Sequence, residues 1–475
     1  MRLQSMLTAG TALSLMGLIL AVVGKAEAVE LSRVTDISPE IYDLSSLTVF
    51  DDALYFSAYD RVHGSELFKY DGTTASLVAD IVPGIESFSP QYLTVFDNAL
   101  YFSADDKVNG YELFKYDGTT VSLVGDINPG FWYSLPAQLT VFDNALYFSA
   151  EDGFHGRELW KYDGATASLV ADINQCSLFN LQLCSINPDG SSHGSDPSGL
   201  TVFNNALYFS AYDGSALSGL HGRELWKYDG TTASLAADIF PSISSLYQES
   251  SNPKDFTVFN NALYFNANDN SPYGGELWKY DGNTASLVSD IFPNRGRFTF
   301  GPSHLTVFDN ALYFSASDGV GGPELWKYDG TTVSLVAEIN PLRSEQDLGN
   351  STGSFPFGLT VFDNALYFNA NDGVHGPELW KYDGTTVSLA DINPGSEGSY
   401  PYGFTIFNKA LYFSAGDRLN GREIWKLEPD EPTSVPEPAS ALGLLAFSAL
   451  GTGSMLKRKL QKAAQLGIVD SETSD

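Results

Sequence analysis

Basic side chains are scarce in this chain of 475 residues. Lys and Arg together number 26 against 58 Asp and Glu, which gives a formal net charge of −32 at pH 7. This imbalance excludes nucleic acid as a natural partner, because phosphate binding needs a basic surface from which counterions are released. It is typical instead of a solvated exterior protein that attracts cations.

Cysteine is almost absent, since Cys176 and Cys184 are the only two and lie in one segment between repeats. Without a second cysteine pair, the four ligands of a structural zinc site are incomplete. In an exported protein, two cysteines this close predict a small disulfide that closes a loop. Phosphate-cradling glycine loops and His-Glu-x-x-His motifs are also missing, so we expect a non-catalytic protein without a cofactor.

The first 28 residues have the pattern of a secretory signal peptide. Arg2 precedes an apolar run over residues 6–23, and the small-residue sequence Ala26-Glu27-Ala28 follows it. This order predicts export and cleavage after Ala28.

A second apolar run lies near the C-terminus. Residues 429–438 form a linker that ends in Val435-Pro436-Glu437-Pro438, and an apolar stretch over 439–456 precedes Lys457-Arg458-Lys459. The stretch is near the lower length limit for crossing a bilayer, and its basic flank is expected to stay cytoplasmic.

Pro436, Glu437 and Pro438, followed by the apolar helix and the basic cluster, resemble the PEP-CTERM sorting segment of bacteria. The resemblance implies an exosortase-type processing enzyme as a partner and a membrane-anchoring function for residues 439–475. Family members usually stop soon after the basic cluster, whereas this chain continues from residue 460 to 475. The alternative is a plain membrane anchor, and both interpretations place the body at the cell surface or in the extracellular matrix.

One unit repeats through the body of the chain. The phrase Leu-Thr-Val-Phe-Asp-Asp-Ala-Leu-Tyr-Phe-Ser-Ala recurs with small changes in eight copies, which start near residues 47, 93, 139, 200, 256, 305, 359 and 404. The period of about 50 residues is kelch-like. Two-residue Asp-Asn turns and Asp-Gly turns separate four short strands in each unit, and four antiparallel strands make one propeller blade.

The two ends of the array predict how it closes. The last unit stops after its third strand, Glu423-Ile424-Trp425-Lys426-Leu427, while the fourth-strand phrase occurs ahead of the first unit at residues 31–37. We therefore predict an all-β fold, an eight-bladed propeller over residues 31–428, in which the N-terminal strand closes the last blade. The alternative is an open solenoid, which would need caps at both ends.

The phrase Glu-Leu-Trp-Lys-Tyr-Asp-Gly-Thr resembles the Glu-Leu-Trp-x-x-Asp-Gly-Thr repeats of large bacterial surface and secreted proteins. The resemblance covers residues 31–428 and implies architecture only, because that repeat class carries no shared catalytic motif.

Loops that vary in length are expected to emerge on one face of the propeller, where a rigid scaffold commonly carries its binding residues. Aromatic side chains in these loops are candidates for stacking on sugar rings or anchoring a protein partner, and the alternative is that they pack the loops onto the blades. These candidates are Phe131, Trp132, Tyr133, Tyr247, Phe298, Phe300, Phe355 and Tyr402.

Every unit also has an Asp after its second strand and a Glu that opens its third. Because a catalytic site is needed once, we interpret these acids as structural: the Asp caps a turn, and the Glu bonds to N–H groups of a neighbouring loop. Four histidines, at 63, 155, 221 and 375, are interpreted as loop packing or surface residues. Calcium is a weaker hypothesis, with Asp152, Asp318 and Asp372 as candidate ligands.

Three functions follow from these patterns. The first is a non-catalytic exported protein that binds an extracellular glycan or a surface protein through its variable loops. The second is an extracellular polysaccharide hydrolase or lyase, which needs a cluster of carboxylates that is not repeated in every blade. The third is a structural envelope protein stiffened by calcium.

Overall fold

The computed structural model describes most of the repeat region. The described residues are 31–34, 42–174, 194–213, 221–241, 250–268, 275–291, 300–319, 322–341, 353–417 and 421–430. Contacts divide the chain into residues 1–430 and 431–475. The predicted signal peptide, both cysteines and the sorting segment lie outside the described residues. Within the described residues, no helix has the length and hydropathy needed to span a membrane.

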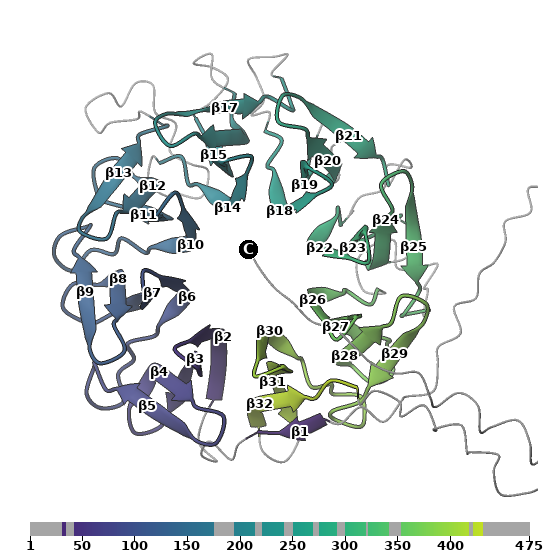
Figure 1. Ribbon diagram of the computed structural model, residues 1–475, viewed down its shortest axis with the longest axis horizontal. Helices are drawn as coiled ribbons and strands as arrows, with labels where there is room; N and C mark the ends of the chain where they lie inside the picture. The colour runs from purple at the N-terminus through teal and green to yellow at the C-terminus, as the bar shows by residue number, and fades with distance from the viewer. Residues whose placement is uncertain are drawn as a thin grey trace, which may run out of the picture. The chain divides into compact units, whose positions relative to one another are not determined.

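Thirty-two strands form eight four-stranded antiparallel sheets, arranged around a central opening as blades (Figure 1). Blades 1 and 2 contain β2 (Tyr42–Phe50), β3 (Ala53–Asp60), β4 (Gly64–Tyr70) and β5 (Ala75–Ala79), then β6 (Gln91–Phe96), β7 (Ala99–Asp105), β8 (Tyr111–Tyr116) and β9 (Val121–Gly125). Blades 3 and 4 contain β10 (Ala137–Phe142), β11 (Ala145–Glu151), β12 (Arg157–Tyr162) and β13 (Ala167–Ala171), then β14 (Ser198–Phe203), β15 (Ala206–Tyr212), β16 (Arg223–Tyr228) and β17 (Ala233–Ala237).

The second half of the ring continues in the same order. Blades 5 and 6 contain β18 (Lys254–Phe259), β19 (Ala262–Ala267), β20 (Glu276–Tyr280) and β21 (Ala285–Ser289), then β22 (Ser303–Phe308), β23 (Ala311–Ala316), β24 (Glu324–Tyr328) and β25 (Val333–Ala337). Blade 7 contains β26 (Phe357–Phe362), β27 (Ala365–Asn371), β28 (Pro377–Tyr382) and β29 (Val387–Ala390), and blade 8 contains β30 (Tyr402–Phe407), β31 (Ala410–Asp417), β32 (Gly421–Leu427) and β1 (Leu31–Arg33).

Blade 8 confirms the predicted closure. Its strand order is β1-β32-β31-β30, so the outermost strand comes from the N-terminal end of the repeat region. Leu31 pairs with Leu427 and Arg33 with Trp425, and the backbone N–H of Val34 donates to the carbonyl of Ile424. The strand is described over Leu31–Arg33, and residues 35–37 of the predicted strand lie outside the described residues.

The two tight turns of each blade follow from their residues. Asp97 and Asn98, which join β6 to β7, both have positive φ, as a two-residue hairpin of type I′ requires. In the turn after β8, the side chain of Asp117 accepts hydrogen bonds from the backbone N–H groups of Thr119 and Thr120. We call the end of the propeller that carries these turns the turn face.

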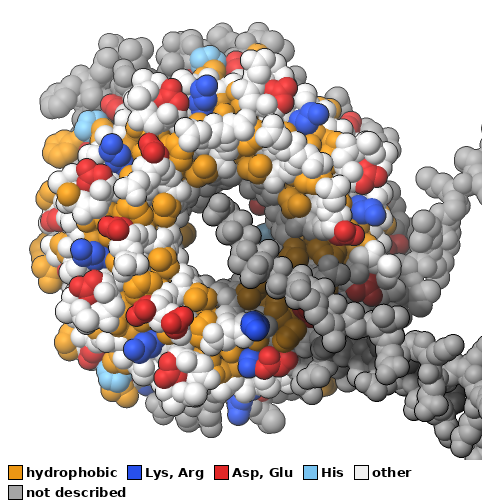
Figure 2. All heavy atoms as spheres, viewed as in Figure 1, with side chains coloured by type: hydrophobic (Ala, Val, Ile, Leu, Met, Phe, Trp, Pro, Cys, Tyr) orange, Lys and Arg blue, Asp and Glu red, His pale blue; other side chains and the backbone are white. Residues whose placement is uncertain are grey.

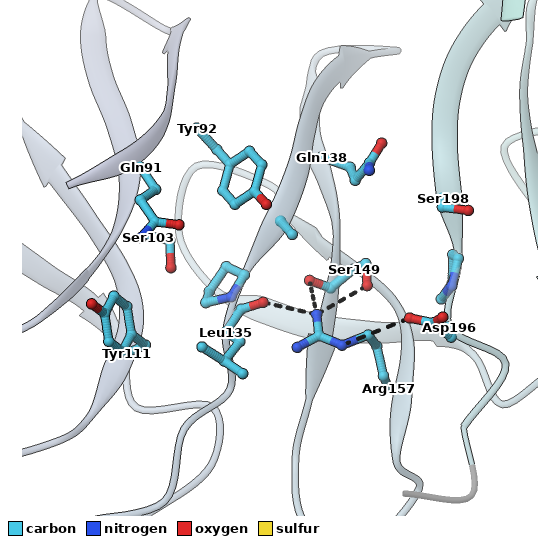
Figure 3. A pocket seen from close by; sticks show the side chains of 13 residues that line it. Gln91, Tyr92, Ser103, Tyr111, Leu135, Gln138, Ser149, Arg157, Asp196 and Ser198 are labelled. Carbon is cyan, nitrogen blue, oxygen red and sulfur yellow. Dashed lines mark hydrogen bonds and ion pairs between the residues drawn. The ribbon is translucent and has the colours of Figure 1, made fainter. Parts of the chain in front are cut away.

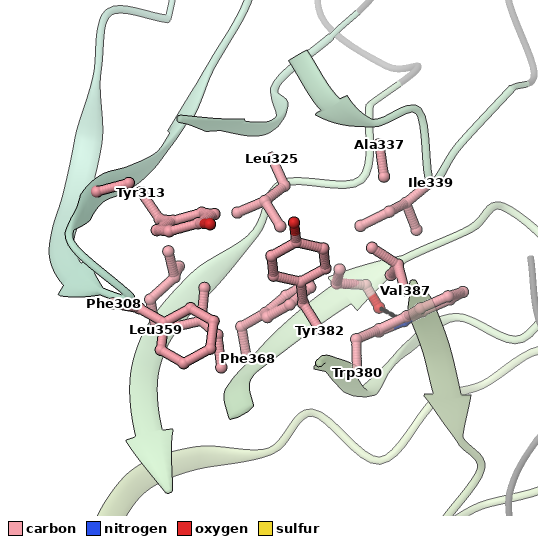
Figure 4. Packing of buried hydrophobic residues seen from close by; sticks show 13 residues of the cluster. Phe308, Tyr313, Leu325, Ala337, Ile339, Leu359, Phe368, Trp380, Tyr382 and Val387 are labelled. Carbon is pink, nitrogen blue, oxygen red and sulfur yellow. Dashed lines mark hydrogen bonds between the residues drawn. The ribbon is translucent and has the colours of Figure 1, made fainter. Parts of the chain in front are cut away.

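Hydrophobic side chains pack between neighbouring blades. The second strand of each blade is buried along its length, as in the pattern of β7. In the junction of blades 6 and 7, the rings of Tyr313 and Tyr382 are tilted relative to each other with centroids 5.6 Å apart, and Phe368 is fully buried in the same cluster as Leu325 (Figure 4). Each core therefore belongs to two blades, so the ring is held together by contacts between neighbours.

A hydrogen bond at the inner strands links the blades further. Thr48 of β2 donates from Oγ1 to the carbonyl of Leu93 in β6, and the same bond recurs from Thr94 to Leu139. Thr405 donates to Leu47 and thereby joins blade 8 to blade 1. On the face shown in Figure 2, basic and acidic side chains recur around the ring, and hydrophobic side chains gather around the central opening.

The variable loops meet at the opposite end, which we call the loop face. The backbone N–H of Asp105, at the end of β7, donates to the carbonyl of Phe88 in the loop that enters blade 2. The N–H of Ser89 in that same loop donates to Ser65 at the start of the third strand of blade 1. Loops within a blade and loops between blades thus lie together, as the sequence predicted.

Candidate functional site

Because the chain contains eight copies of one unit, positions at which the copies differ can be separated from the shared framework. The core residues are nearly the same in every blade. The residue directly before the repeated Glu of the third strand is not: it is Ser65, Tyr111, Arg157, Arg223, Gly275, Pro323, Pro377 and Arg422 in blade order. A feature that only some blades carry is better suited to binding a ligand than one that all eight share.

The start of each inner strand varies as well. The register shifts between Gln91 and Thr94 and at the same place in blade 3, and this irregularity gives Tyr92 and Gln138 positive φ values of 56° and 61°. Such bulges redirect a side chain. Here they place different residues from successive blades at the mouth of the central opening on the loop face.

A pocket of about 330 Å³ lies between blades 2, 3 and 4 at this position (Figure 3). It is lined by side chains with hydroxyl, amide and charged groups together with a few apolar ones. The lining residues are Gln91, Tyr92, Ser103, Tyr111, Leu135, Pro136, Ala137, Gln138, Ser149, Arg157, Asp196, Pro197 and Ser198.

Arg157 of β12 is held in place by oxygens of its own blade. Its Nη1 donates to the carbonyl of Leu135 at 2.8 Å and to the backbone and side-chain oxygens of Ser149 at 3.3 and 3.1 Å. Its Nε lies 3.9 Å from Asp196, at the outer limit of an ion pair. The guanidinium is therefore fixed mainly by neutral acceptors.

Asp196 belongs more closely to the next blade. Arg223 of β16 donates from Nη1 to the Asp196 carbonyl at 2.7 Å and from Nη2 to its carboxylate at 3.0 Å. The carboxylate is thus shared between two arginines, of which Arg223 is the nearer. Asp196 is the only carboxylate among the residues that line the pocket.

An aromatic loop between blades 2 and 3 borders the pocket. Phe131, Trp132 and Tyr133 are 81%, 72% and 50% exposed, and Tyr133 meets Tyr111 edge-on with ring centroids 5.8 Å apart. Gly110 lies beneath them with φ of +78°, and a Cβ there would come within 2.6 Å of the Tyr133 ring. Glycine at this position lets the aromatic loop approach the blade.

Buried Glu112 anchors the same loop from below. Its carboxylate accepts hydrogen bonds from the N–H groups of Ile127, Asn128 and Ser134 and from the Ser134 hydroxyl, at 2.6 to 3.4 Å. The equivalent Glu158 accepts the same set of bonds in blade 3. The repeated glutamates therefore tie each blade to the loop that leaves it, in agreement with their structural interpretation.

Because of these glutamates, we expect the free energy of unfolding to depend on pH. Burial raises the pKa of Glu112 to about 7, and hydrogen bonds from Ser134 and Ile127 oppose the rise. The same shift recurs at Glu66, Glu158, Glu224, Glu324 and Glu378.

Because the folded pKa lies above the ordinary 4.5, the contribution to stability is complete below that pH and is lost as the pH rises towards 7. We expect the free energy of unfolding, measured with denaturant, to be larger at pH 5 than at pH 8. The Glu112→Gln variant should show a smaller difference between these pH values. A stability that increases from pH 5 to pH 8 would contradict this assignment.

The acids that follow the second strands are also engaged within the blades. The carboxylate of Asp152 accepts from the N–H groups of Phe154 and His155, and its other oxygen lies 2.6 Å from Nδ1 of His155. This bond raises the pKa of His155. Asp372 has the same arrangement with His375, so neither acid presents a free set of oxygens for calcium.

Asp318 lines a cavity of about 10 Å³ together with Glu324 and Glu338. No three His, Cys, Asp or Glu side chains in the described ranges are placed to hold a metal ion together.

The predicted aromatic residues occupy different places. Tyr133 contacts Tyr111 of the pocket lining, and Trp132 precedes Tyr133 in the same loop. Phe300, in the loop between blades 5 and 6, contacts Phe355, in the loop between blades 6 and 7, with ring centroids 5.5 Å apart. Tyr402 lies under the guanidinium of Arg422 at 4.6 Å, and its hydroxyl donates to the Leu44 carbonyl. Tyr247 and Phe298 lie outside the described residues.

The sequence analysis missed Tyr92, Tyr111, Arg157 and Asp196 because it searched the long loops for aromatic side chains. A comparison of the eight copies position by position would have found Arg157, since arginine directly precedes the repeated Glu in only three blades.

No family model and no curated protein match this chain. Among solved structures, it is similar to a puromycin-hydrolyzing peptidase of Mycobacterium tuberculosis, with 9% identity and a TM-score of 0.45, over 83% of this chain and 61% of that one. It is also similar to a GH74 xyloglucanase from Xanthomonas campestris, with 14% identity and a TM-score of 0.44, over 82% of this chain and 59% of that one. The chain spans about three fifths of these proteins, and similarity of this extent says nothing about its activity.

Proposed function

We propose that this protein is an exported, non-catalytic propeller that binds an extracellular glycan in the pocket between blades 2, 3 and 4. One observation carries the proposal: positions at which otherwise equivalent blades differ, among them Tyr92, Tyr111 and Arg157, line one pocket on the loop face. A sugar offers many hydroxyl groups around a partly apolar ring. The pocket offers matching partners in Gln91, Ser103 and Gln138, with Tyr92 and Tyr111 as ring surfaces.

The aromatic loop supports a glycan over a small ligand. Phe131, Trp132 and Tyr133 extend the surface beyond the pocket, so a chain of several sugars could be contacted at once. Large exposed apolar side chains that lie together mark interaction sites. Export and surface display are inferred from residues 1–28 and from the segment around Pro436, Glu437 and Pro438.

Absence of catalysis is part of the proposal. Hydrolysis of a glycosidic bond commonly needs two carboxyl groups, one on each side of the bond. The pocket contributes one carboxylate, Asp196, which is already paired with Arg223. We therefore expect bound glycans to be recovered intact.

The proposal is tested with the purified full-length protein on a panel of neutral and acidic exopolysaccharides, with binding and chain length of the glycan both measured. Trp132→Ala combined with Tyr133→Ala should weaken binding at least tenfold, about 1.4 kcal/mol. Tyr400→Ala is the matched control, because Tyr400 is 51% exposed but belongs to the loop between blades 7 and 8 and not to the pocket between blades 2, 3 and 4. Shortening of the glycan, or equal binding by both variants, would refute the proposal.

A further inference from the structure

The charge of the pocket narrows the class of glycan. Of its lining residues, only Arg157 and Asp196 are charged at neutral pH. Arg223 lies 3.0 Å from the Asp196 carboxylate, whereas Arg157 is 3.9 Å away. One acid therefore faces two arginines, and the excess positive charge resides on Arg157. This is a local reversal in a chain whose net charge is −32.

The geometry of Arg157 is suited to an anion. Nη1 is held by Leu135 and Ser149, so the plane of the guanidinium is fixed before any ligand arrives. Figure 3 shows its second terminal nitrogen without a hydrogen bond or ion pair to the other residues drawn. A planar guanidinium donates paired hydrogen bonds to a carboxylate or a sulfate, and bonds between ionised partners are about twice as strong as neutral ones.

Blade 8 provides an internal comparison. Arg422 occupies the same position in its blade as Arg157 does, and its Nη1 donates to the carbonyl of Tyr400 and to the hydroxyl of Ser414. These acceptors correspond to Leu135 and Ser149. However, Arg422 lies over the ring of Tyr402 and does not line the pocket between blades 2, 3 and 4. The blade framework thus holds an arginine at this position in both blades. Only in blade 3 does that arginine also line the pocket between blades 2, 3 and 4.

We propose that the pocket recognises an anionic sugar residue, a uronate or a sulfated sugar, whose negative group binds Arg157 while its hydroxyl groups bind Ser103, Ser149 and Gln138. This inference rests on the proposed glycan binding and adds the chemical class of the ligand. Asp196 limits the preference for anionic over neutral sugars, because its carboxylate lies beside the bound anion and repels it.

The experiment compares three probes of equal length: cellohexaose, its C6-oxidised hexauronate and its C6-sulfated form. The full-length protein should bind one or both anionic probes at least tenfold more tightly than cellohexaose, and added salt should reduce the difference. The anionic probe that binds more tightly identifies the group, since both carry the charge on C6 of the same backbone. Equal binding of all three probes would overturn the inference and leave glycan binding intact.

Variants of the two charged residues separate a charge effect from a folding effect. Arg157→Gln should lose at least tenfold in affinity for the anionic probe and little for cellohexaose, whereas Arg422→Gln should lose neither. Asp196→Asn should bind the anionic probe more tightly, about threefold or more, which damage to the fold would not produce. Unchanged anion binding in both pocket variants would overturn the assignment. If no glycan on any panel binds, the proposed function itself fails.

Discussion

Removal of residues 31–34 from the full-length protein is expected to destabilise blade 8 and to make the protein associate. β1 supplies the outer strand of blade 8, and without it β32 presents unpaired N–H and C=O groups along its outer edge. Exposed strand edges pair with other chains. The lost backbone hydrogen bonds and the uncovered apolar contacts of Leu31 together amount to about 5 kcal/mol.

The measurements are the midpoint of thermal unfolding and the molecular mass in solution. We expect the shortened protein to unfold at a lower temperature and to form dimers or larger species, while Ser32→Ala, at an exposed position of the same strand, should behave as the unchanged protein does. A monomer with an unaltered midpoint would show that three inner strands suffice for blade 8.

Replacing Glu112 with Ala is expected to have the second large effect. The change leaves three buried N–H groups and the Ser134 hydroxyl without their common acceptor. Each buried group that loses its partner costs about 1 to 3 kcal/mol, and relaxation of the loop lowers the sum, so we expect a loss of about 4 kcal/mol in the free energy of unfolding.

The same variant should reduce glycan binding, because Ser134 follows directly on the aromatic loop. Denaturant unfolding at pH 5, where the contribution of Glu112 to stability is nearly complete, measures the first effect, and titration with the best-bound glycan measures the second. Glu86→Ala is the control, since Glu86 is exposed on the corresponding loop of the preceding junction. A destabilisation no greater than that of the control would show that water replaces the carboxylate.

Much of the fold could be predicted because the same strand and turn pattern occurs in eight copies of one unit. The paired Asp-Asn turns and the alternation in Ala-Leu-Tyr-Phe-Ser-Ala are local signals. The position of residues 31–33 on blade 8 followed from counting strands at the two ends. These features depend on neighbours in sequence or on the repeat itself.

The pocket could not be predicted in the same way. Arg157 opens a strand and Asp196 precedes another, and they approach each other only because blades 3 and 4 pack side by side. Tyr92 lines the pocket because the register of β6 shifts between Gln91 and Thr94. The local sequence does not predict this shift. Loop length and aromatic content predicted Trp132 and Tyr133 as binding residues. The same criteria also predicted Phe300 and Phe355, which contact each other elsewhere on the ring.

The direction of the threonine bonds gives the ring a rotational sense. Each bond found runs from an inner strand to the next blade in chain order, from Thr48 to Leu93 and finally from Thr405 back to Leu47. All such junctions are head-to-tail copies of a single interface, and a head-to-tail interface closes only if its rotation divides a full turn. With eight blades that rotation is about 45°. Because tyrosines and phenylalanines fill the space between neighbouring blades, we expect their volume to influence this rotation, and a larger or smaller side chain at all junctions together to favour a ring of different size.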